Sequence, residues 1–156
     1  MRKMVLILMV ALMCAAPAMA AGSACKIVPT KPETTGTARL SVVTFSWTSD
    51  DATGAVSATT NAEINKFMTG KILMFVITDP GSSAPTDNYD ATLTDGYGVD
   101  IMEAGLANRD TANSEQVKPK TNGSDDNRLI TGALTLAVTN AGNSSTGRVI
   151  LVLLGL

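Results

Sequence analysis

Residues 71–79 of this 156-residue chain read KILMFVITD, and the six residues from Ile72 to Ile77 are all apolar. An unbroken apolar run of this length is typical of a β-strand that is covered on both faces. Pro80-Gly81 follows directly and ends the strand, because both residues favour turns. A second apolar run, RVILVLL, occupies residues 148–154. The sequence therefore predicts two strongly apolar strands that are far apart in the chain.

Shorter segments rich in β-branched and aromatic residues alternate with clusters of Gly, Asn, Asp and Pro. No apolar 3.6-residue period persists for a dozen residues, and only residues 61–68 could form a helical turn. This pattern predicts an all-β chain: a single β-sandwich or jelly-roll-like domain of about seven or eight short antiparallel strands. The other predicted strands are residues 39–48, their partner 55–60 after a turn at 50–54, a hairpin within 87–102, a short strand near 115–118, and 128–140.

The N-terminal sequence MRKMVLILMVALMCAAPAMA has a basic start, an apolar middle and a small-residue end. This layout predicts a secretory signal peptide at residues 1–20, and its apolar part is too short to span a bilayer. We expect an exported protein, periplasmic or extracellular, with no stable membrane anchor after cleavage. Residues 21–37 hold two prolines and many small polar residues, which predicts a flexible tail before a domain at residues 38–156.

The net charge and the number of cysteines indicate which binding partners and which disulfides to expect. Removal of Arg2 and Lys3 with the signal leaves ten basic and fourteen acidic residues, a net charge near −4. This balance argues against a nucleic-acid-binding surface, which needs a basic stripe. Only Cys25 remains after cleavage, so no internal disulfide can form. Cys25 is either an unpaired thiol or part of a disulfide between subunits.

The segment DNYDATLTDGYGVDIM, residues 87–102, can be tested for strand register. Apolar residues alternate along 89–94, and Val99 is the first apolar residue of the strand that follows. A two-residue loop would set apolar side chains opposite polar ones, whereas a three-residue loop at 95–97 pairs Leu93 with Val99 on one face. We therefore expect an amphipathic hairpin with an odd-length loop or a bulge at Gly96.

The same segment is the strongest candidate for a carboxylate site, because it contains Asp87, Asp90, Asp95 and Asp100. Their spacing matches no calcium-binding loop, and aspartates of this kind commonly form turns and solvated strand faces. The chain has no histidine, no Gly-x-Ser-x-Gly motif and no phosphate-binding loop. We expect no catalytic residue, no metal and no cofactor, and hence no enzyme. Tyr97, in the predicted loop, is the best candidate for an exposed contact.

Residues 77–117 and 132–154 resemble small structural proteins encoded in the virion gene clusters of tailed bacteriophages. The shared elements are Pro-Thr-Asp-x-Tyr-Asp at 85–90, Gly-Val-Asp-hydrophobic at 98–101, a Gly-x-Ala-Asn-Arg loop at 105–109, and a closing strand and turn at 134–143. FSWTSDDATGAV at 45–56 fits the opening of that family as well.

The resemblance implies a non-enzymatic virion component that forms a homo-oligomer or docks on capsid, tail or other surface proteins. The long loop at 103–127 and the last apolar strand are then candidates for contact between subunits, although a buried central strand also explains the latter. The candidate interaction residues are Tyr97, Arg109, Val149, Leu151 and Leu153.

The predicted signal peptide departs from the family, because virion parts of tailed phages assemble in the cytoplasm. Either a cell has adopted the gene for an exported protein, or an unusual phage exports it. The alternative function is an exported bacterial surface or periplasmic binding module, with glycan as one candidate ligand.

Overall fold

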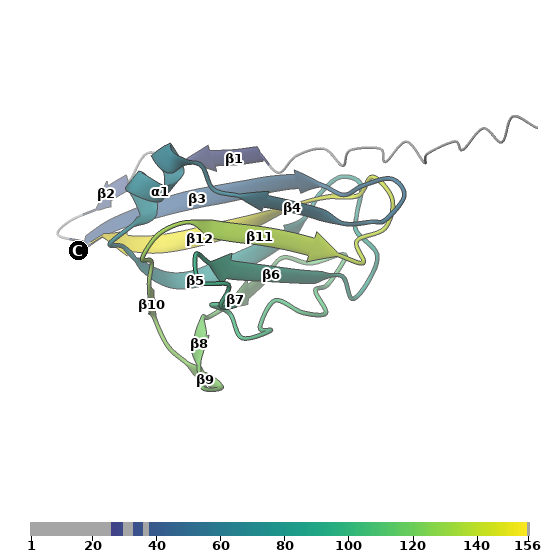
Figure 1. The fold of residues 1–156 in the computed structure, drawn as a ribbon. Helices are drawn as coiled ribbons and strands as arrows, with labels where there is room; N and C mark the ends of the chain where they lie inside the picture. Colours follow the sequence, from purple (N-terminus) through teal and green to yellow (C-terminus); the bar gives the residue numbers. More distant parts are fainter. Residues whose placement is uncertain (1–25, 30–32, 36–37, 156) are drawn as a thin grey trace, which may run out of the picture.

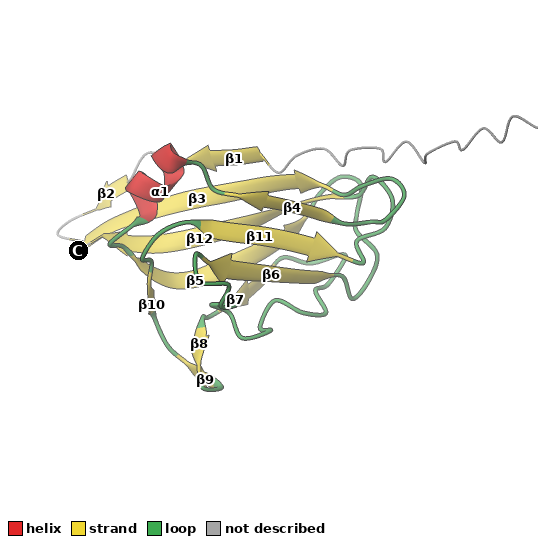
Figure 2. Ribbon diagram, viewed as in Figure 1, coloured by secondary structure: helices red, strands yellow, loops and turns green. Residues whose placement is uncertain are grey.

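The computed structural model of the chain describes residues 26–29, 33–35 and 38–155, with side chains from Leu40 onward. Two antiparallel sheets pack face to face, which confirms the predicted all-β sandwich (Figures 1 and 2). The elements are β1 (Lys26–Pro29), β2 (Glu33–Thr35), β3 (Ala38–Thr48), β4 (Val56–Thr59), α1 (Ala62–Met68), β5 (Ile72–Pro80), β6 (Asp90–Asp95), β7 (Glu115–Val117), β8 (Lys120–Thr121), β9 (Ser124–Asp125), β10 (Arg128–Leu129), β11 (Leu134–Thr139) and β12 (Thr146–Gly155).

The large sheet has the strand order β1-β3-β12-β5-β10, with β2 also paired to β3 and β7 to β5. The small sheet has the order β4-β11-β6 and lies in front of the large sheet in Figure 1. Strands β8 and β9 form a separate two-stranded ribbon. Strand β12 pairs with both β3 and β5, so the two apolar runs of the sequence lie side by side at the centre of the large sheet.

The core lies between the two sheets. On the inner face of the large sheet, cross-strand neighbours from β3, β12 and β5 form the rows Ser41–Leu153–Leu73, Val43–Leu151–Val76 and Phe45–Val149–Thr78, and all of these residues are buried. The small sheet covers them with buried Leu134, Leu136 and Val138 of β11 and with Ala91 and Leu93 of β6. Most strands therefore contribute every second side chain to one apolar layer, and in β5 a bulge between Leu73 and Phe75 shifts the register by one residue.

The short helix α1 forms because Asn61 caps it: the Asn61 side chain accepts a hydrogen bond from the Ile64 amide at 2.9 Å. Ile64 and Met68 lie one helical turn apart and are both buried in the core. The helix leads from β4 in the small sheet to β5 in the large sheet. Among the described residues, no helix is both long and apolar enough to cross a membrane.

Three predictions about strands need correction. Strand β4 follows β3 in sequence, but it pairs with β11 and not with β3, because the chain crosses to the other sheet at the turn. Residues 26–29 and 33–35, expected in a flexible tail, form strands paired to β3, so the paired part of the domain begins at Lys26 rather than at Ala38. Residues 128–140 form two strands instead of one. The predicted signal peptide and Cys25 lie outside the described residues.

The predicted odd-length hairpin loop is confirmed, although it lies one residue later. Asp95 and Val99 close a three-residue loop, Gly96 to Gly98, in which the Asp95 amide donates to the Val99 carbonyl at 2.9 Å. Gly98 has a φ of 80°, the left-handed conformation that this type of loop requires. The pairing is therefore shifted by two residues, and the Ile101 amide, not that of Val99, lies opposite Leu93 at 2.9 Å. Both registers keep the apolar side chains on one face.

Candidate functional site

The outer face of the large sheet is the most unusual surface of the protein. Its cross-strand neighbours from β3, β12 and β5 form three rows, here called the apolar rows: Leu40–Leu154–Ile72, Val42–Val152–Phe75 and Thr44–Ile150–Ile77. Thr44 is their one polar residue, whereas the covered inner rows contain both Ser41 and Thr78. The outer face is thus at least as apolar as the face that the small sheet covers.

The apolar rows are only partly shielded. Leu40 is exposed, and the other side chains of the rows are half-buried, in contrast to the fully buried inner rows. Among the described residues, no helix or strand forms a third layer over this face. The prediction that residues 71–79 are covered on both faces is therefore confirmed for one face only. Leu129 of β10 lies opposite Ile72 and extends the end row, with 57% of its surface exposed.

A row of different character, the polar row Ser46–Arg148–Asp79, lies at the other end of the same face. The Arg148 guanidinium pairs with Asp79, and its Nε donates to the Asp79 carboxylate at 2.8 Å. Burial of Asp79 raises its pKa, but hydrogen bonds from Ser114 and Arg148 outweigh this effect and lower the pKa below its usual value. Asp79 is thus ionised at neutral pH and pairs with Arg148, and Lys26 of β1 lies opposite Ser46 at the edge of the same row.

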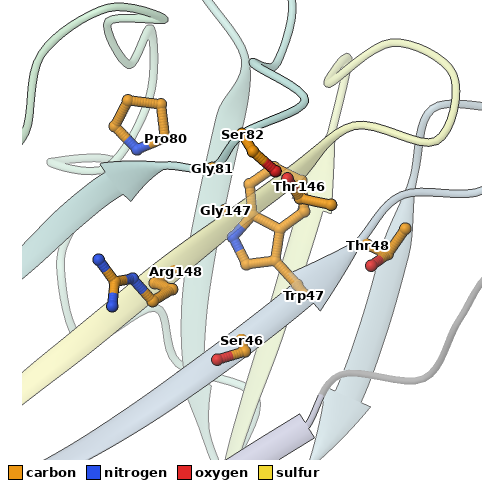
Figure 3. A pocket seen from close by; sticks show the side chains of 9 residues that line it. All are labelled: Ser46, Trp47, Thr48, Pro80, Gly81, Ser82, Thr146, Gly147 and Arg148. Carbon is orange, nitrogen blue, oxygen red and sulfur yellow. The ribbon is translucent and has the colours of Figure 1, made fainter.

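A shallow groove of about 570 Å³ lies at this polar end, where β3, β12 and the end of β5 meet (Figure 3). Side chains of Ser46, Thr48, Ser82, Thr146 and Arg148 line it. The indole of Trp47 lies against Gly147, where a Cβ atom would come within 2.4 Å of the ring. Only 2% of Trp47 is exposed, because it packs inward at 5.7 Å from the ring of Tyr89. Trp47 therefore lines the groove with very little exposed surface, and the groove offers mainly hydroxyl and guanidinium groups to a ligand.

The structure corrects three of the five candidate interaction residues. Val149, Leu151 and Leu153 are 0% exposed, because they point into the core from the inner face of β12. The residues of the same strand that point outward are Ile150, Val152 and Leu154. The alternative interpretation of the last apolar run, a buried central strand, is confirmed for these three residues. An apolar run has no alternation to tell its two faces apart, so only the structure could assign them.

Arg109 is also unavailable for contacts with other molecules, because its side chain binds residues in the loop between β6 and β7 and at the start of β7. Its side chain is 14% exposed, pairs with Glu115 at 3.4 Å and donates twice to the Ala107 carbonyl at 3.0 and 2.8 Å. The Arg109 amide donates to the Tyr89 carbonyl at 2.8 Å, which ties this loop to the start of β6. The expected interaction role of Arg109 is therefore replaced by a structural one.

Tyr97 is the one sequence-predicted candidate that lies open to solvent. It is 86% exposed at the tip of the hairpin loop, next to the exposed Val99. A shallow pocket of about 250 Å³ beside it is lined in part by Leu129 and Arg128 of β10. Leu129 therefore borders both the Tyr97 loop and the end of the apolar rows.

The four aspartates of residues 87–102 do not form one cluster: Asp87 lies in the turn before β6, Asp90 and Asp95 are at the two ends of β6, and Asp100 follows the hairpin loop. Asp95 accepts hydrogen bonds from the amides of Tyr97 and Val99 at 2.9 and 3.0 Å, and Asp100 accepts from Met102 and Ala104 at 3.0 and 2.8 Å. Within the part of the chain that the structure describes, no three acidic or cysteine side chains converge as a metal site would require. Asp95 and Asp100 therefore organise local turns, whereas Asp90 accepts hydrogen bonds from the Asn108 amide at 3.0 Å and the Asn140 side chain at 2.9 Å and so links distant loops.

Glu103 is a contact that the sequence did not indicate. Its carboxylate accepts hydrogen bonds from the Gly123 and Asn122 amides at 2.7 and 2.8 Å, which lowers its pKa. Asn122 and Gly123 both have positive φ, and Asn-Gly is the preferred pair for a two-residue hairpin turn. This turn joins β8 to β9, so Glu103 holds their ribbon against the loop that follows β6.

Comparison with known proteins adds no further identification: no protein-family model, no curated protein and no solved structure matches this chain.

Proposed function

We propose that this chain is a non-enzymatic structural protein of the phage-virion type that acts by self-assembly or by docking on capsid or tail proteins. The observation that carries the proposal is the outer face of the large sheet, where three apolar rows remain uncovered by any described element. Exposed apolar areas of several hundred Å² on a folded protein mark interaction sites. The sequence resemblance to small virion proteins supports the same role.

The charge distribution on this face agrees with a binding rather than a catalytic role. The apolar rows hold no titratable group, and the polar row carries the mutually neutralised Arg148 and Asp79. Catalysis by acid–base or nucleophilic groups needs such groups beside an enclosed pocket. The outer face instead offers a broad sheet surface suited to another protein.

The test is to locate the protein in the organism that encodes it. An antibody against the chain is applied to density-gradient fractions that separate phage particles from secreted and periplasmic protein. We expect the chain to band with intact particles in a fixed ratio to the major capsid protein. A chain that is found wholly in the secreted or periplasmic fraction, with no particle-bound portion, would overturn the virion role.

The groove at the polar end favours a second candidate, an exported surface or periplasmic binding module for a small polar ligand. Its volume of about 570 Å³ and its hydroxyl groups suit such a ligand. A glycan array probed with the wild-type protein and with Thr146→Val tests it. Binding that the variant loses would favour this function, and the absence of binding to any glycan would overturn the glycan form of it.

A further inference from the structure

We infer that the partner on the outer face of the large sheet is a second copy of this chain, packed sheet on sheet across the apolar rows. This inference rests on the proposed function and makes it specific, since it names the surface and its occupant. It uses Ile150, Val152 and Leu154 on β12 and Ile72, Phe75 and Ile77 on β5 as the contact residues.

The first argument is the likeness between the two faces of the large sheet. The inner face, with Leu, Val and Phe in cross-strand rows, is covered by another sheet in this same molecule. The outer rows have the same kind of side chains at the same spacing. Two sheets with equal right-handed twist pack at about −30° and about 10 Å apart. A second copy presents a face of the same shape and composition.

The second argument is charge. The described domain belongs to an acidic chain, with twelve basic and fourteen acidic residues overall, and two acidic proteins usually repel each other. On β3, β12 and β5 the outer face avoids this repulsion, because the apolar rows are uncharged and the charged residues of the polar row form the Arg148–Asp79 ion pair. A two-fold interface brings a patch against its own copy, so it must be free of unpaired charge. The three central strands β3, β12 and β5 meet that requirement, whereas the charged residues Lys26 and Glu33 lie opposite Ser46 and Leu40 on the edge strands β1 and β2.

The third argument is size. Strand β3 has 11 residues, which corresponds to a length of about 36 Å. The five-strand path of the large sheet is about 24 Å wide at the usual strand spacing. The other strands of this path are shorter, with 4, 10, 9 and 2 residues. One face of the path therefore covers roughly 600 Å², and two copies would bury about 1,200 Å² in total, the lower end of specific protein interfaces. The apolar rows would form the part of the interface that excludes water, and the polar row would form part of the rim of the interface.

The experiment compares matched substitutions at the centres of the two outer faces. Val152 lies between Val42 and Phe75 on the large sheet, and Ala137 lies between Ser57 and Thr92 on the small sheet. Residues 21–156, which include all described strands, are made as wild type, Val152→Asp, Val152→Thr and Ala137→Asp. Sedimentation equilibrium from micromolar to millimolar concentration gives the association constant of each, and circular dichroism checks the fold.

We expect wild type and Ala137→Asp to self-associate equally, and Val152→Asp to associate at least about 30-fold more weakly, the effect of a central interface residue. Val152→Thr, which keeps the shape of valine, decides the matter if the aspartate variant does not fold. Self-association that survives both Val152 substitutions would overturn this inference and leave assembly through another surface, such as the Tyr97 loop. A wild type that stays monomeric to millimolar concentration would overturn self-assembly altogether, while docking on capsid or tail proteins is decided separately by the particle experiment.

Discussion

The two outer sheet faces of this sandwich differ sharply in composition. On the small sheet, the outward residues of β4, β11 and β6 are mostly threonine: Thr59, Thr135 and Thr94 lie side by side in one row, and Thr59 and Thr135 share a hydrogen bond of 2.8 Å between their hydroxyls. We call this the threonine face. On the large sheet, the corresponding positions hold the apolar rows. One outer face suits water, and the other resembles the core.

This difference shows that the alternation of apolar and polar residues along a strand is not imposed by the sheet itself. In an antiparallel sandwich, one face of each sheet packs on the core and the other is normally polar. Strands β6 and β11 follow this rule, since buried and accessible side chains alternate along them. Strand β12 keeps the alternation of burial, and β5 keeps it except at a bulge where Met74 and Phe75 are both half-buried, but both strands are largely apolar at both sets of positions. The outward apolar residues of these two strands lie outside the core between the sheets, and the proposed assembly would account for them.

The largest expected effect on stability comes from truncation to alanine of two neighbouring leucines, Leu153 and Leu154, which point to opposite faces of β12. Leu153→Ala removes a side chain that is fully buried between Ser41 and Leu73, and should lower the free energy of unfolding by about 3 kcal/mol. Leu154→Ala, on the outer face, should cost about 1 kcal/mol or less, because a half-buried side chain loses less transfer free energy. Urea unfolding of dilute protein measures both. Equal losses would mean that the chain itself covers its outer face.

The next effect concerns the inner side of the polar end, where Gly147 lies under Trp47. A Cβ atom there would lie 2.4 Å from Cζ2 of the indole, so Gly147→Ala should displace the ring and cost about 1–3 kcal/mol. Trp47 is the only tryptophan in the chain, so its emission should shift to longer wavelength as the ring gains exposure. Gly132→Ala is the control, because its Cβ would meet no atom within 4 Å. An unshifted emission maximum with wild-type stability would contradict this account of the packing.

A smaller effect on stability is expected in the polar row, which differs from the apolar rows because it contains titratable residues. The pKa of Asp79 is lower in the folded protein than its ordinary value, so the stability that its contacts provide is present at neutral pH and is lost as pH falls through the lowered pKa. This contribution is about 1 kcal/mol or less, because the Arg148 side chain is largely exposed. Asp79→Asn should therefore unfold more easily than wild type at pH 7 and show a smaller loss of stability between neutral and acidic pH. Glu103 and Asp110 also have lowered pKa values and keep part of the acid sensitivity in the variant. Urea midpoints at several pH values measure this, and parallel curves for both proteins would count against it.

The sequence was a good guide to fold class, because strand positions depend on local composition and turns. The first strand, residues 39–48, was predicted within a residue of β3. The pairing of β4 was missed because its Ala55–Thr60 segment carries no signal for which sheet it joins. The odd-length loop followed from alternation alone, since parity decides which face each residue occupies. Its exact position depended on the positive φ of Gly98, and Gly96 is an equally good candidate in the sequence.

The sequence predicted only part of the candidate interaction surface. The apolar run at residues 148–154 was predicted to be either a contact strand or a buried central strand, and Val149 and Val152 are the same residue type on opposite faces. Which of them is inward depends on the register with β3 and β5, and hence on residues about a hundred positions away. Arg109 was misjudged for a similar reason, because its partner Glu115 could be identified only once the loop was folded. Tyr97 needed no tertiary information, since its place in a turn was sufficient to predict exposure.

The smallest expected effect tests whether the threonine face is merely polar or is itself a binding surface. Thr135→Val removes the hydroxyl contact with Thr59 and replaces it with a side chain of the same shape. An exposed hydroxyl exchanges its partner for water, and valine suits a strand as well as threonine does. The free energy of unfolding should therefore change by no more than about 0.5 kcal/mol, within the range of ordinary surface substitutions. Urea unfolding and sedimentation equilibrium measure stability and association together. If Thr135→Val alters the association constant, the threonine face also lies in an interface. The distinction between a solvent-exposed threonine face and an interface formed by the apolar rows would then be wrong.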